Sequence, residues 1–210
     1  MKALAATVIA GAALAGVAGA APPVTMTLVA SAPTVAYGSP VTLSGQISTK
    51  KAGQPITIQG TECGSTKQVK AANVKTVADG KFSTPVKPTL RTSYMATFKN
   101  GMSPVVVVTV KPVLELKRVA PGSFTANVTA GQALTGKYLS FQRYKKLRKR
   151  WTQVKRVKLA RAVAGPAKPT MISSVSFKSK LARGTRLRVL ITTAQAAPCY
   201  VKAASKSIRA

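Results

Sequence analysis

The sequence has almost no acidic residues and no histidine. Its 210 residues include 33 Lys and Arg but only three acids, Glu62, Asp79 and Glu115, which leaves a net charge of +30. General acid–base catalysis mostly relies on histidine or on paired carboxylates, and these three acids are far apart in the sequence. The composition therefore argues against an enzyme and favours a protein that faces a polyanion.

Residues that hold metal ions and cofactors are also missing. Two cysteines without histidine fall short of a four-ligand zinc site, and an isolated Asp79 cannot supply the oxygens that calcium needs. The sequence contains no glycine-rich phosphate-binding loop, and no serine has a neighbour that would activate it as a nucleophile. We therefore predict no metal, no cofactor and no catalytic residue.

The positive charge is concentrated in the second half of the chain. Residues 21–112 contain 10 Lys and Arg against 2 acids, whereas residues 113–210 contain 22 against 1. Such a field raises the local concentration of anions and speeds the encounter with polyanions, although salt screens it within about 8–10 Å. A simpler interpretation is that the charge only keeps the protein soluble.

The N-terminus has the organisation of a secretory signal peptide. Met1-Lys2 is a short positive segment, Ala3–Val17 is apolar, and Ala18-Gly-Ala20 offers a cleavage site before Ala21. A retained transmembrane anchor is the alternative, but the apolar stretch is mostly Ala and Gly and is shorter than the roughly 20 residues that a bilayer requires. We predict that residues 1–20 are removed, that the mature chain is secreted or at the cell surface, and that it has no integral membrane segment.

Export makes the two cysteines a candidate pair. An even number of cysteines in an oxidising compartment allows one disulfide, here between Cys63 and Cys199. Two free or buried thiols are the alternative, because a sequence does not show whether the two Cα atoms come within about 7 Å of each other.

Alternation of β-branched and polar residues, punctuated by turns, predicts an all-β chain. About seven strands are expected before Pro112, a count that fits an immunoglobulin-like sandwich. Asp79-Gly80 predicts a hairpin after one of them. The expected strands are Thr25–Ala30, Val41–Ile47, Pro55–Gln59, Val69–Val77, Phe82–Val86, Thr92–Phe98, Pro104–Val110, Val113–Val119, Ser123–Thr129, Lys137–Tyr144, Trp151–Leu159, Ile172–Lys178, Arg186–Thr192 and Lys202–Arg209.

A weak internal repeat suggests that the chain contains two similar units. Gly53–Gln59 and Gly136–Gln142 both follow the pattern Gly-x-x-apolar-hydroxyl-apolar-Gln. Seven matched positions can also arise from a shared strand and turn without common ancestry. Because the proline at 112 divides the mature chain into nearly equal halves, we predict two tandem sandwiches, at residues 21–112 and 113–210.

The turn and strand-end patterns resemble those of tandem bacterial immunoglobulin-like domains in secreted proteins of actinobacterial type. The segments that carry the resemblance are Tyr37–Gly45, Ala52–Ile56, Asp79–Phe82 and Pro88–Tyr94, with a fainter version at Gly136-Lys137, Gln142-Arg143 and Trp151–Val154. The resemblance implies adhesion, spacing or ligand presentation outside the cell. The charge of the second half departs from what a mere spacer would need.

The densest cluster of charge predicts a basic hairpin. Tyr138–Tyr144 and Trp151–Leu159 are expected to be strands, and Lys145–Arg150 between them has five cations in six residues. Three acids cannot pair with so many cations, so these side chains must face solvent or an anion, and arginine can hold phosphate or sulfate with two hydrogen bonds. The predicted polyanion-binding residues are Arg143, Lys145, Lys146, Arg148, Lys149, Arg150, Lys155 and Arg156.

Two aromatic residues bracket this hairpin loop. Tyr144 and Trp151 are candidates to stack on sugar rings or bases, although for Trp151 we favour the alternative, a core residue of its sandwich. Alternation fails after Trp151, which predicts a bulge or an edge strand. Lys and Arg on an edge strand also resist aggregation, which is a structural reason for some of the charge. Arg183, Arg186 and Arg188 form a second basic group, and the sequence does not show whether it joins the first.

We therefore predict a secreted, non-enzymatic binding or adhesion protein. Its C-terminal domain would associate electrostatically with an extracellular polyanion, such as a cell-wall polymer, an acidic polysaccharide, an anionic surface or DNA. The alternatives are a structural spacer without a specific polyanion partner and an accessory module of an extracellular enzyme system.

Overall fold

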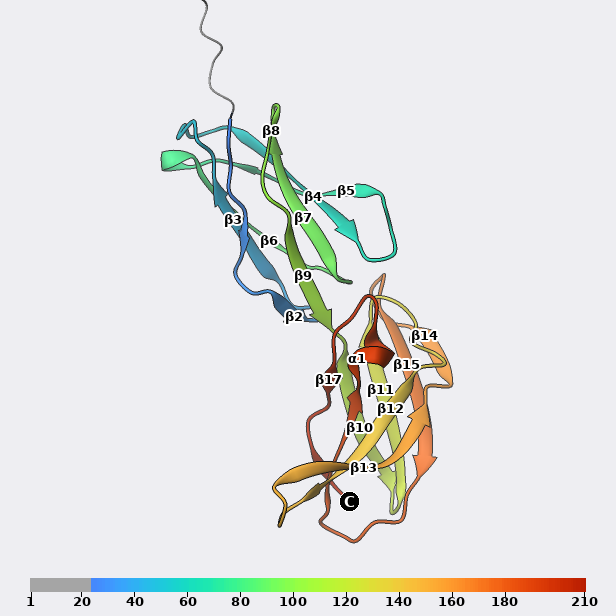
Figure 1. Cartoon of the computed structure of the whole chain (residues 1–210). Helices are drawn as coiled ribbons and strands as arrows, with labels where there is room; N and C mark the ends of the chain where they lie inside the picture. The colour runs from blue at the N-terminus through green and yellow to red at the C-terminus, as the bar shows by residue number, and fades with distance from the viewer. Residues whose placement is uncertain (1–23) are drawn as a thin grey trace, which may run out of the picture.

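The chain is all-β. The computed structural model describes residues 24–210, so the signal peptide predicted at residues 1–20 lies outside the described residues. Among these, the helices are α1 (Thr193–Ala196) and one turn of 3-10 helix, η1 (Ala78–Gly80). The strands form four sheets, and in residues 24–210 no sheet combines strands from both sides of Pro112 (Figure 1).

Before Pro112, a three-stranded and a six-stranded sheet form the N-terminal half. The smaller sheet has the order β1-β3-β6, and the larger has the order β2-β9-β7-β4-β5, with β8 paired to β7. The strands are β1 (Val29–Ala30), β2 (Thr34–Ala36), β3 (Val41–Gln46), β4 (Pro55–Glu62), β5 (Gln68–Lys75), β6 (Lys81–Val86), β7 (Thr92–Phe98), β8 (Gly101–Met102) and β9 (Val106–Lys111).

After Pro112, a four-stranded and a five-stranded sheet form the C-terminal half. The first has the order β10-β11-β15-β14 and the second β13-β12-β16-β17, with β18 also paired to β16. This order is that of the two sheets of an immunoglobulin-like sandwich. The strands are β10 (Val113–Ala120), β11 (Ser123–Ala130), β12 (Tyr138–Lys145), β13 (Arg150–Lys158), β14 (Arg161–Ala164), β15 (Met171–Lys178), β16 (Arg186–Ile191), β17 (Ala203–Ala204) and β18 (Ile208–Arg209).

The repeated motif occupies equivalent places in the two halves. β4 lies between β5 and β7, and β12 lies in the same way between β13 and β16. Where β4 pairs with β5, the register shifts by one residue between Ile58 and Gln59, and where β12 pairs with β13, it shifts between Phe141 and Gln142. In both cases these are the last two positions of the motif. Both motifs therefore end at a β-bulge, which bends the neighbouring edge strand.

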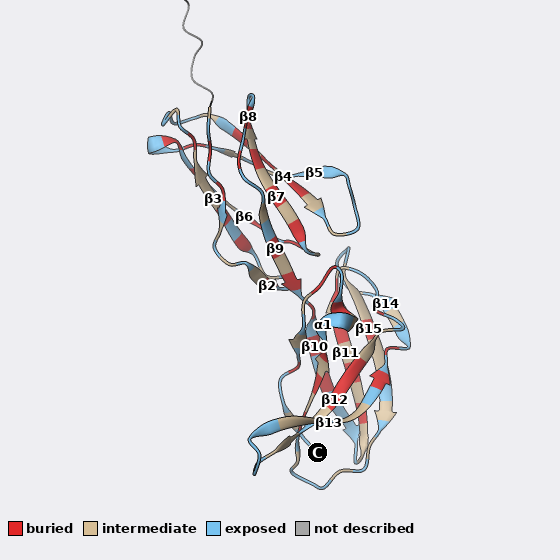
Figure 2. Ribbon diagram, viewed as in Figure 1, coloured by how far each residue is buried: buried red, intermediate tan, exposed pale blue. Residues whose placement is uncertain are grey.

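Alternating side chains of the strands fill the interior of each half. In the C-terminal half the two sheets meet through aromatic rings: Phe141 of β12 lies with its ring centroid 5.4 Å from that of Phe124 on β11 and 4.9 Å from that of Phe177 on β15. Figure 2 shows the buried positions running along the strands of both halves. The period-2 pattern of the sequence thus places one face of each strand in a core.

Some local predictions were wrong. Asp79-Gly80 does not connect paired strands, because β5 pairs with β4 whereas β6 pairs with β3, so the turn carries the chain from one sheet to the other. Asp79 and Gly80 both have positive φ, as expected for an Asp-Gly turn. The Asp-Gly pair therefore predicts a tight turn, but it does not determine whether the strands before and after the turn pair with each other. The sequence also missed β2, β8, β14 and α1, and the last expected strand is broken into β17 and β18.

A disulfide joins the two halves near Pro112. Cys63 and Cys199 are bonded, with their Cα atoms 5.3 Å apart and 136 residues between them in sequence. Hydrogen bonds beside it also cross from one half to the other, from the Val201 N–H to the Val110 carbonyl oxygen and between the hydroxyls of Tyr37 and Thr170. Within residues 24–210, no helix is long and apolar enough to span a bilayer.

Candidate functional site

The basic hairpin β12–β13 projects from the C-terminal half (Figure 1). Lys145 pairs with Arg150, so the strands are one residue longer at this end than predicted and the turn is confined to residues 146–149. Lys149 adopts positive φ and donates its N–H to the Lys146 carbonyl oxygen at 3.1 Å, which closes the turn. The four turn side chains are exposed, so the cations among them face solvent.

Strand geometry divides the predicted binding residues between two faces of the hairpin. Tyr144 and Trp151 are directly opposite each other and share one face, with their ring centroids 5.3 Å apart. Because successive side chains alternate, Arg143, Lys145 and Arg150 lie on the other face. The predicted residues therefore do not form one continuous surface.

A bulge at Val154 changes the phase of β13. Phe141 is opposite Lys155 whereas Gln142 is opposite Gln153, so Val154 is the extra residue, and β13 is also the edge strand of its sheet. This confirms the predicted failure of alternation. Lys155 is turned away from the Trp151 face, because its ammonium donates to the Lys178 carbonyl oxygen at 2.7 Å.

The outer face of the five-stranded sheet instead gathers cations from three strands. Arg186 and Arg188 alternate with the buried Leu187 and Val189 on β16 and so point outward. Arg209 is directly opposite Arg186 in the register. On β13 the outward positions after the bulge are Arg156 and Lys158, opposite Ser140 and Tyr138. We call this surface the cationic face; its members are Arg156, Lys158, Arg186, Arg188 and Arg209.

Arg188 is held in place from two sides. Its Nε donates a hydrogen bond to Gln142 Oε1 at 2.8 Å, and its guanidinium carbon lies 4.2 Å from the centroid of the Trp151 ring. Gln142 in turn donates from Nε2 to Ser140 Oγ at 3.3 Å, and Ser140 donates to Gln153 Oε1 at 2.8 Å. Partial burial lowers the pKa of Arg188.

Two further arginines lie over tyrosine rings. The guanidinium carbon of Arg156 is 4.5 Å from the centroid of Tyr138, and that of Arg186 is 5.2 Å from the centroid of Tyr144. Rings in such positions attract a cation through the negative potential of their faces. The aromatic residues of the face thus position cations, and the covered side of each ring is not open to a sugar or a base.

Trp151 is half-buried and does not belong to the core of the C-terminal half. One side of its ring is covered by Arg188, so its environment matches neither a buried core residue nor a bare stacking platform. The arginine group that the sequence left unassigned divides: Arg186 and Arg188 join the hairpin through Tyr144 and Trp151, whereas Arg183 lies outside β16 in the preceding turn.

All three acids of the chain lie on other elements. Asp79 pairs with Lys81 at 3.5 Å and Glu115 with Lys117 at 3.3 Å, and Glu62 accepts a hydrogen bond from Thr89 at 3.0 Å. The cationic face therefore has no side-chain carboxylate to neutralise it. Like charges at this density attract small anions from solution and favour a ligand that has many negative charges.

The sequence pointed to Arg156, Tyr144 and Trp151 and missed Lys158, Arg186, Arg188 and Arg209 as members of the same surface. Only the position of the bulge and the pairing of β16 with β12 and β18 bring these residues together. The alternation of Arg186 and Arg188 with apolar residues was the one local signal for an outward cationic strand.

Compared by sequence, the chain matches no protein-family model and no curated protein. Compared by structure, it is similar to a tetra-tandem repeat in the extending region of a large adhesion protein, with a TM-score of 0.33, 11% identity, and coverage of 89% of this chain and 48% of that one. It is also similar to bovine butyrophilin, with a TM-score of 0.31, 11% identity, and coverage of 90% and 100%. The chain spans about half the length of the adhesion repeat. At these values the similarities assign no function.

Proposed function

We propose that this protein is a secreted, non-enzymatic binding module that holds an extracellular polyanion on its cationic face. The observation that carries the proposal is a surface of five Lys and Arg residues from three strands, with aromatic and amide side chains holding the arginines and all acids elsewhere. The partner class is a cell-wall polymer, an acidic polysaccharide, an anionic surface or DNA.

Preorganised arginines favour phosphate and sulfate as the groups that are bound. A guanidinium presents two parallel N–H groups to such an anion, and a side chain that is already held by Gln142 and Trp151 loses little freedom on binding. The turn residues 146–149 extend the same positive potential beyond the sheet, where a long polymer can reach them while it lies on the face.

Two features support a location outside the cell. A disulfide between residues 136 apart is stable in an oxidising compartment and is rare in the cytosol. The N-terminal segment Met1–Ala20 has the order of charged, apolar and small residues that a signal peptidase requires. Both fit a polyanion partner on or near the cell envelope.

The test compares two variants that lose the same charge. The face variant replaces Arg156, Lys158, Arg186 and Arg209 with Ser, and the control variant replaces the exposed Lys67, Lys70, Lys75 and Lys87 of the N-terminal half with Ser. Affinity for heparin and for duplex DNA is measured against salt concentration. Each phosphate contact contributes about 0.9 to the slope of log K against log salt, so the face variant should flatten the DNA slope by about 3.6 and the control by less than about 1.

Equal losses in the two variants would overturn the proposal, because the charge would then act as a diffuse field without a site. Such a result would favour the structural interpretation, in which Lys and Arg on the edge strand β13 serve mainly to prevent edge-to-edge pairing.

A further inference from the structure

We call the edge at which the two sheets of a half meet, beside its first strand, the seam. In the N-terminal half hydrogen-bonded strands join the two sheets at the seam, and in the C-terminal half they do not. In the N-terminal half β1 pairs with β3 of one sheet, and β2 then pairs in parallel with β9 of the other, so the start of the half is bonded to both sheets. In the C-terminal half, among the described residues, β10 pairs only with β11, and β17 and β18 pair only with β16. The edge of β10 that faces β17 therefore has no hydrogen-bonded partner, although β16, β17 and β18 pass close to it.

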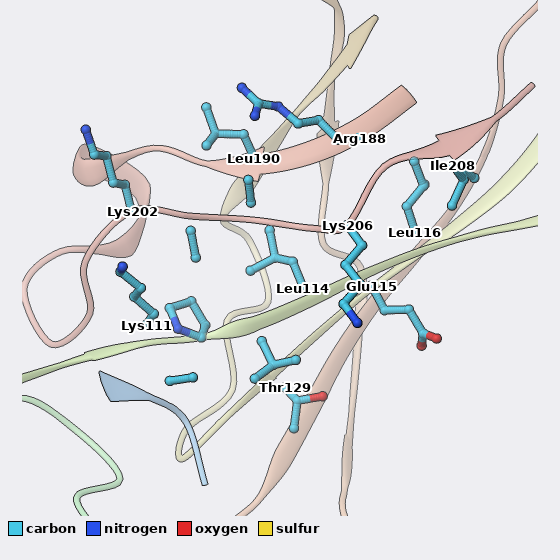
Figure 3. A pocket seen from close by; sticks show the side chains of 15 residues that line it. Lys111, Leu114, Glu115, Leu116, Thr129, Arg188, Leu190, Lys202, Lys206 and Ile208 are labelled. Carbon is cyan, nitrogen blue, oxygen red and sulfur yellow. The ribbon is translucent and has the colours of Figure 1, made fainter. Parts of the chain in front are cut away.

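A groove of about 1050 Å³ runs along this seam. One wall is β10, which contributes side chains from both of its faces, and the other is the segment from Lys202 to Ile208 together with β16 (Figure 3). About five residues of chain from Pro112 onward line the first wall, which corresponds to about 17 Å of extended strand and to the usual length of a strand in a sheet.

The groove has an apolar lining and a positive rim. Leu190 and Ile208, which are half-buried, supply the accessible apolar lining, and the buried Leu114 and Leu116 lie beneath it. Four cations and one acid are the charged residues around it, so its net charge is positive. These residues are Lys111, Arg188, Lys202, Lys206 and Glu115.

The free edge of β10 distinguishes between possible occupants. An acyl chain in the groove would cover backbone N–H and C=O groups without bonding to them, and each covered, unbonded group opposes binding. An extended peptide would instead pair with these groups as an added strand, while its alternate side chains reach the apolar lining. Charge argues against a second copy of this chain, because each copy has a net charge of +30.

We propose that the groove beside β10 binds an extended acidic peptide segment of another protein, which adds to the sheet as a strand. Apolar side chains of the peptide contact Leu190 and Ile208, and its acidic side chains face Lys202 and Lys206. Arg188 belongs to both surfaces, but the inference does not rest on polyanion binding, because Lys202 and Lys206 lie outside the cationic face.

Three capped peptides of six residues serve as probes for binding to the full mature chain. One alternates Glu and Val, one alternates Lys and Val, and the third is the Glu–Val peptide with methyl groups on alternate backbone nitrogens. We expect the Glu–Val peptide to bind and the Lys–Val peptide not to bind. The methylated peptide should bind at least about tenfold more weakly, because it keeps its charge and loses its strand hydrogen bonds. Hydrogen exchange of the β10 amides should slow when the first peptide is bound.

Charge-reversed variants locate the peptide on the protein. Lys202→Glu with Lys206→Glu should weaken the Glu–Val peptide at least about tenfold, because attraction becomes repulsion at two sites. Lys67→Glu with Lys70→Glu changes the net charge equally at residues that do not line the groove, so it should change affinity by less than about twofold. The face variant described above should bind the peptide normally, which keeps this test separate from that of polyanion binding.

Three results would overturn the inference: absence of Glu–Val binding, equal binding of the methylated peptide, or equal losses in the two charge-reversed variants. The last two would reduce the interaction to a general attraction between the basic protein and an acidic probe.

Discussion

The guanidinium of Arg188 lies over the ring of Trp151, with its carbon 4.2 Å from the ring centroid. The two residues belong to β16 and β13, which do not pair with each other because β12 lies between them. The contact therefore links the outer face of the sheet across three strands. It makes Trp151 a support for a cation.

Replacement of Trp151 measures this role. We expect Trp151→Ala to lower the free energy of unfolding by about 1–2 kcal/mol, because a half-buried ring and its cation contacts are lost. A fully buried tryptophan would cost about 3–5 kcal/mol. Heparin affinity should fall in the same variant, because Arg188 loses one of its two supports. Urea unfolding and binding assays on one preparation check both expectations, and a large stability loss with unchanged affinity would contradict them.

The hairpin turn should matter for long polyanions more than for short ones. Replacement of Lys145, Lys146, Arg148, Lys149 and Arg150 with Ser leaves the cationic face intact and removes the charge that projects beyond it. A duplex of about 8 base pairs can lie on the face alone, so it should bind this variant with little loss, whereas a duplex of about 24 base pairs should show a flatter salt slope. Equal losses for both duplexes would identify the hairpin turn, and not the face, as the main contact.

Leu147 at the tip of the hairpin distinguishes a polymer from a lipid surface. Its side chain is 102% exposed, so Leu147→Ser should leave stability unchanged. The substitution changes no charge, and affinity for heparin and DNA should stay the same. Binding to vesicles that contain anionic lipid should weaken only if the tip enters the bilayer interface, where one apolar side chain adds to electrostatic attraction. Vesicle sedimentation of the parent and the variant gives the answer.

Stability should be independent of pH near neutrality and should fall in strong alkali. The chain has no histidine, the side chain that most often titrates between pH 5 and 8. Burial raises the pKa of Tyr94 and of Tyr200 from 10.0 to about 12. Between these values the unfolded chain loses the tyrosine protons that the folded protein keeps, so stability is full below pH 10 and declines as pH rises toward 12.

Urea midpoints between pH 6 and 12 test this expectation. Tyr94→Phe removes one of the two groups and should make the alkaline decline shallower. A decline that begins below pH 9 would contradict the assignment to these tyrosines.

Loss of the disulfide should destabilise the protein. In the chain-entropy model, a loop that spans the 136 residues between Cys63 and Cys199 is worth about 5 kcal/mol. Thermal unfolding of a Cys63→Ser, Cys199→Ser variant and of the reduced parent should therefore show similar, lower midpoints. Mass spectrometry of unreduced peptides must find the two cysteines linked. Separate peptides with free thiols would show that the bond does not form in the exported protein.

The sequence predicted the strands that have clear alternation and missed the ones defined by their neighbours. β7 matches its predicted bounds of Thr92–Phe98, and buried and half-buried positions alternate throughout it. β2 has only three residues and depends on β9 for its hydrogen bonds, so nothing within its own sequence marks it. The division into two folding units, at residues 21–112 and 113–210, stays a prediction that expression of each part alone would test.

The candidate site shows the same limit. The run of charge after Arg143 is visible in the sequence, but the face on which each cation lies depends on one extra residue, Val154. A bulge reverses the orientation of every side chain that follows it, so Arg156 and Lys158 join the cationic face and Lys155 does not. Pairing of β16 beside β12, which adds Arg186 and Arg188, is a long-range contact that no local pattern encodes.

The disulfide also determines what happens when the chain is cut. Exposed Lys and Arg residues are cleavage sites for trypsin-like proteases, and the turn at residues 146–149 presents three of them on a projecting hairpin. This turn lies between Cys63 and Cys199 in the sequence. A single cut in the turn therefore leaves two fragments that remain covalently attached. A protein nicked in this way would keep its cationic strands in one covalently linked molecule. The cut would be detected only after the disulfide is reduced.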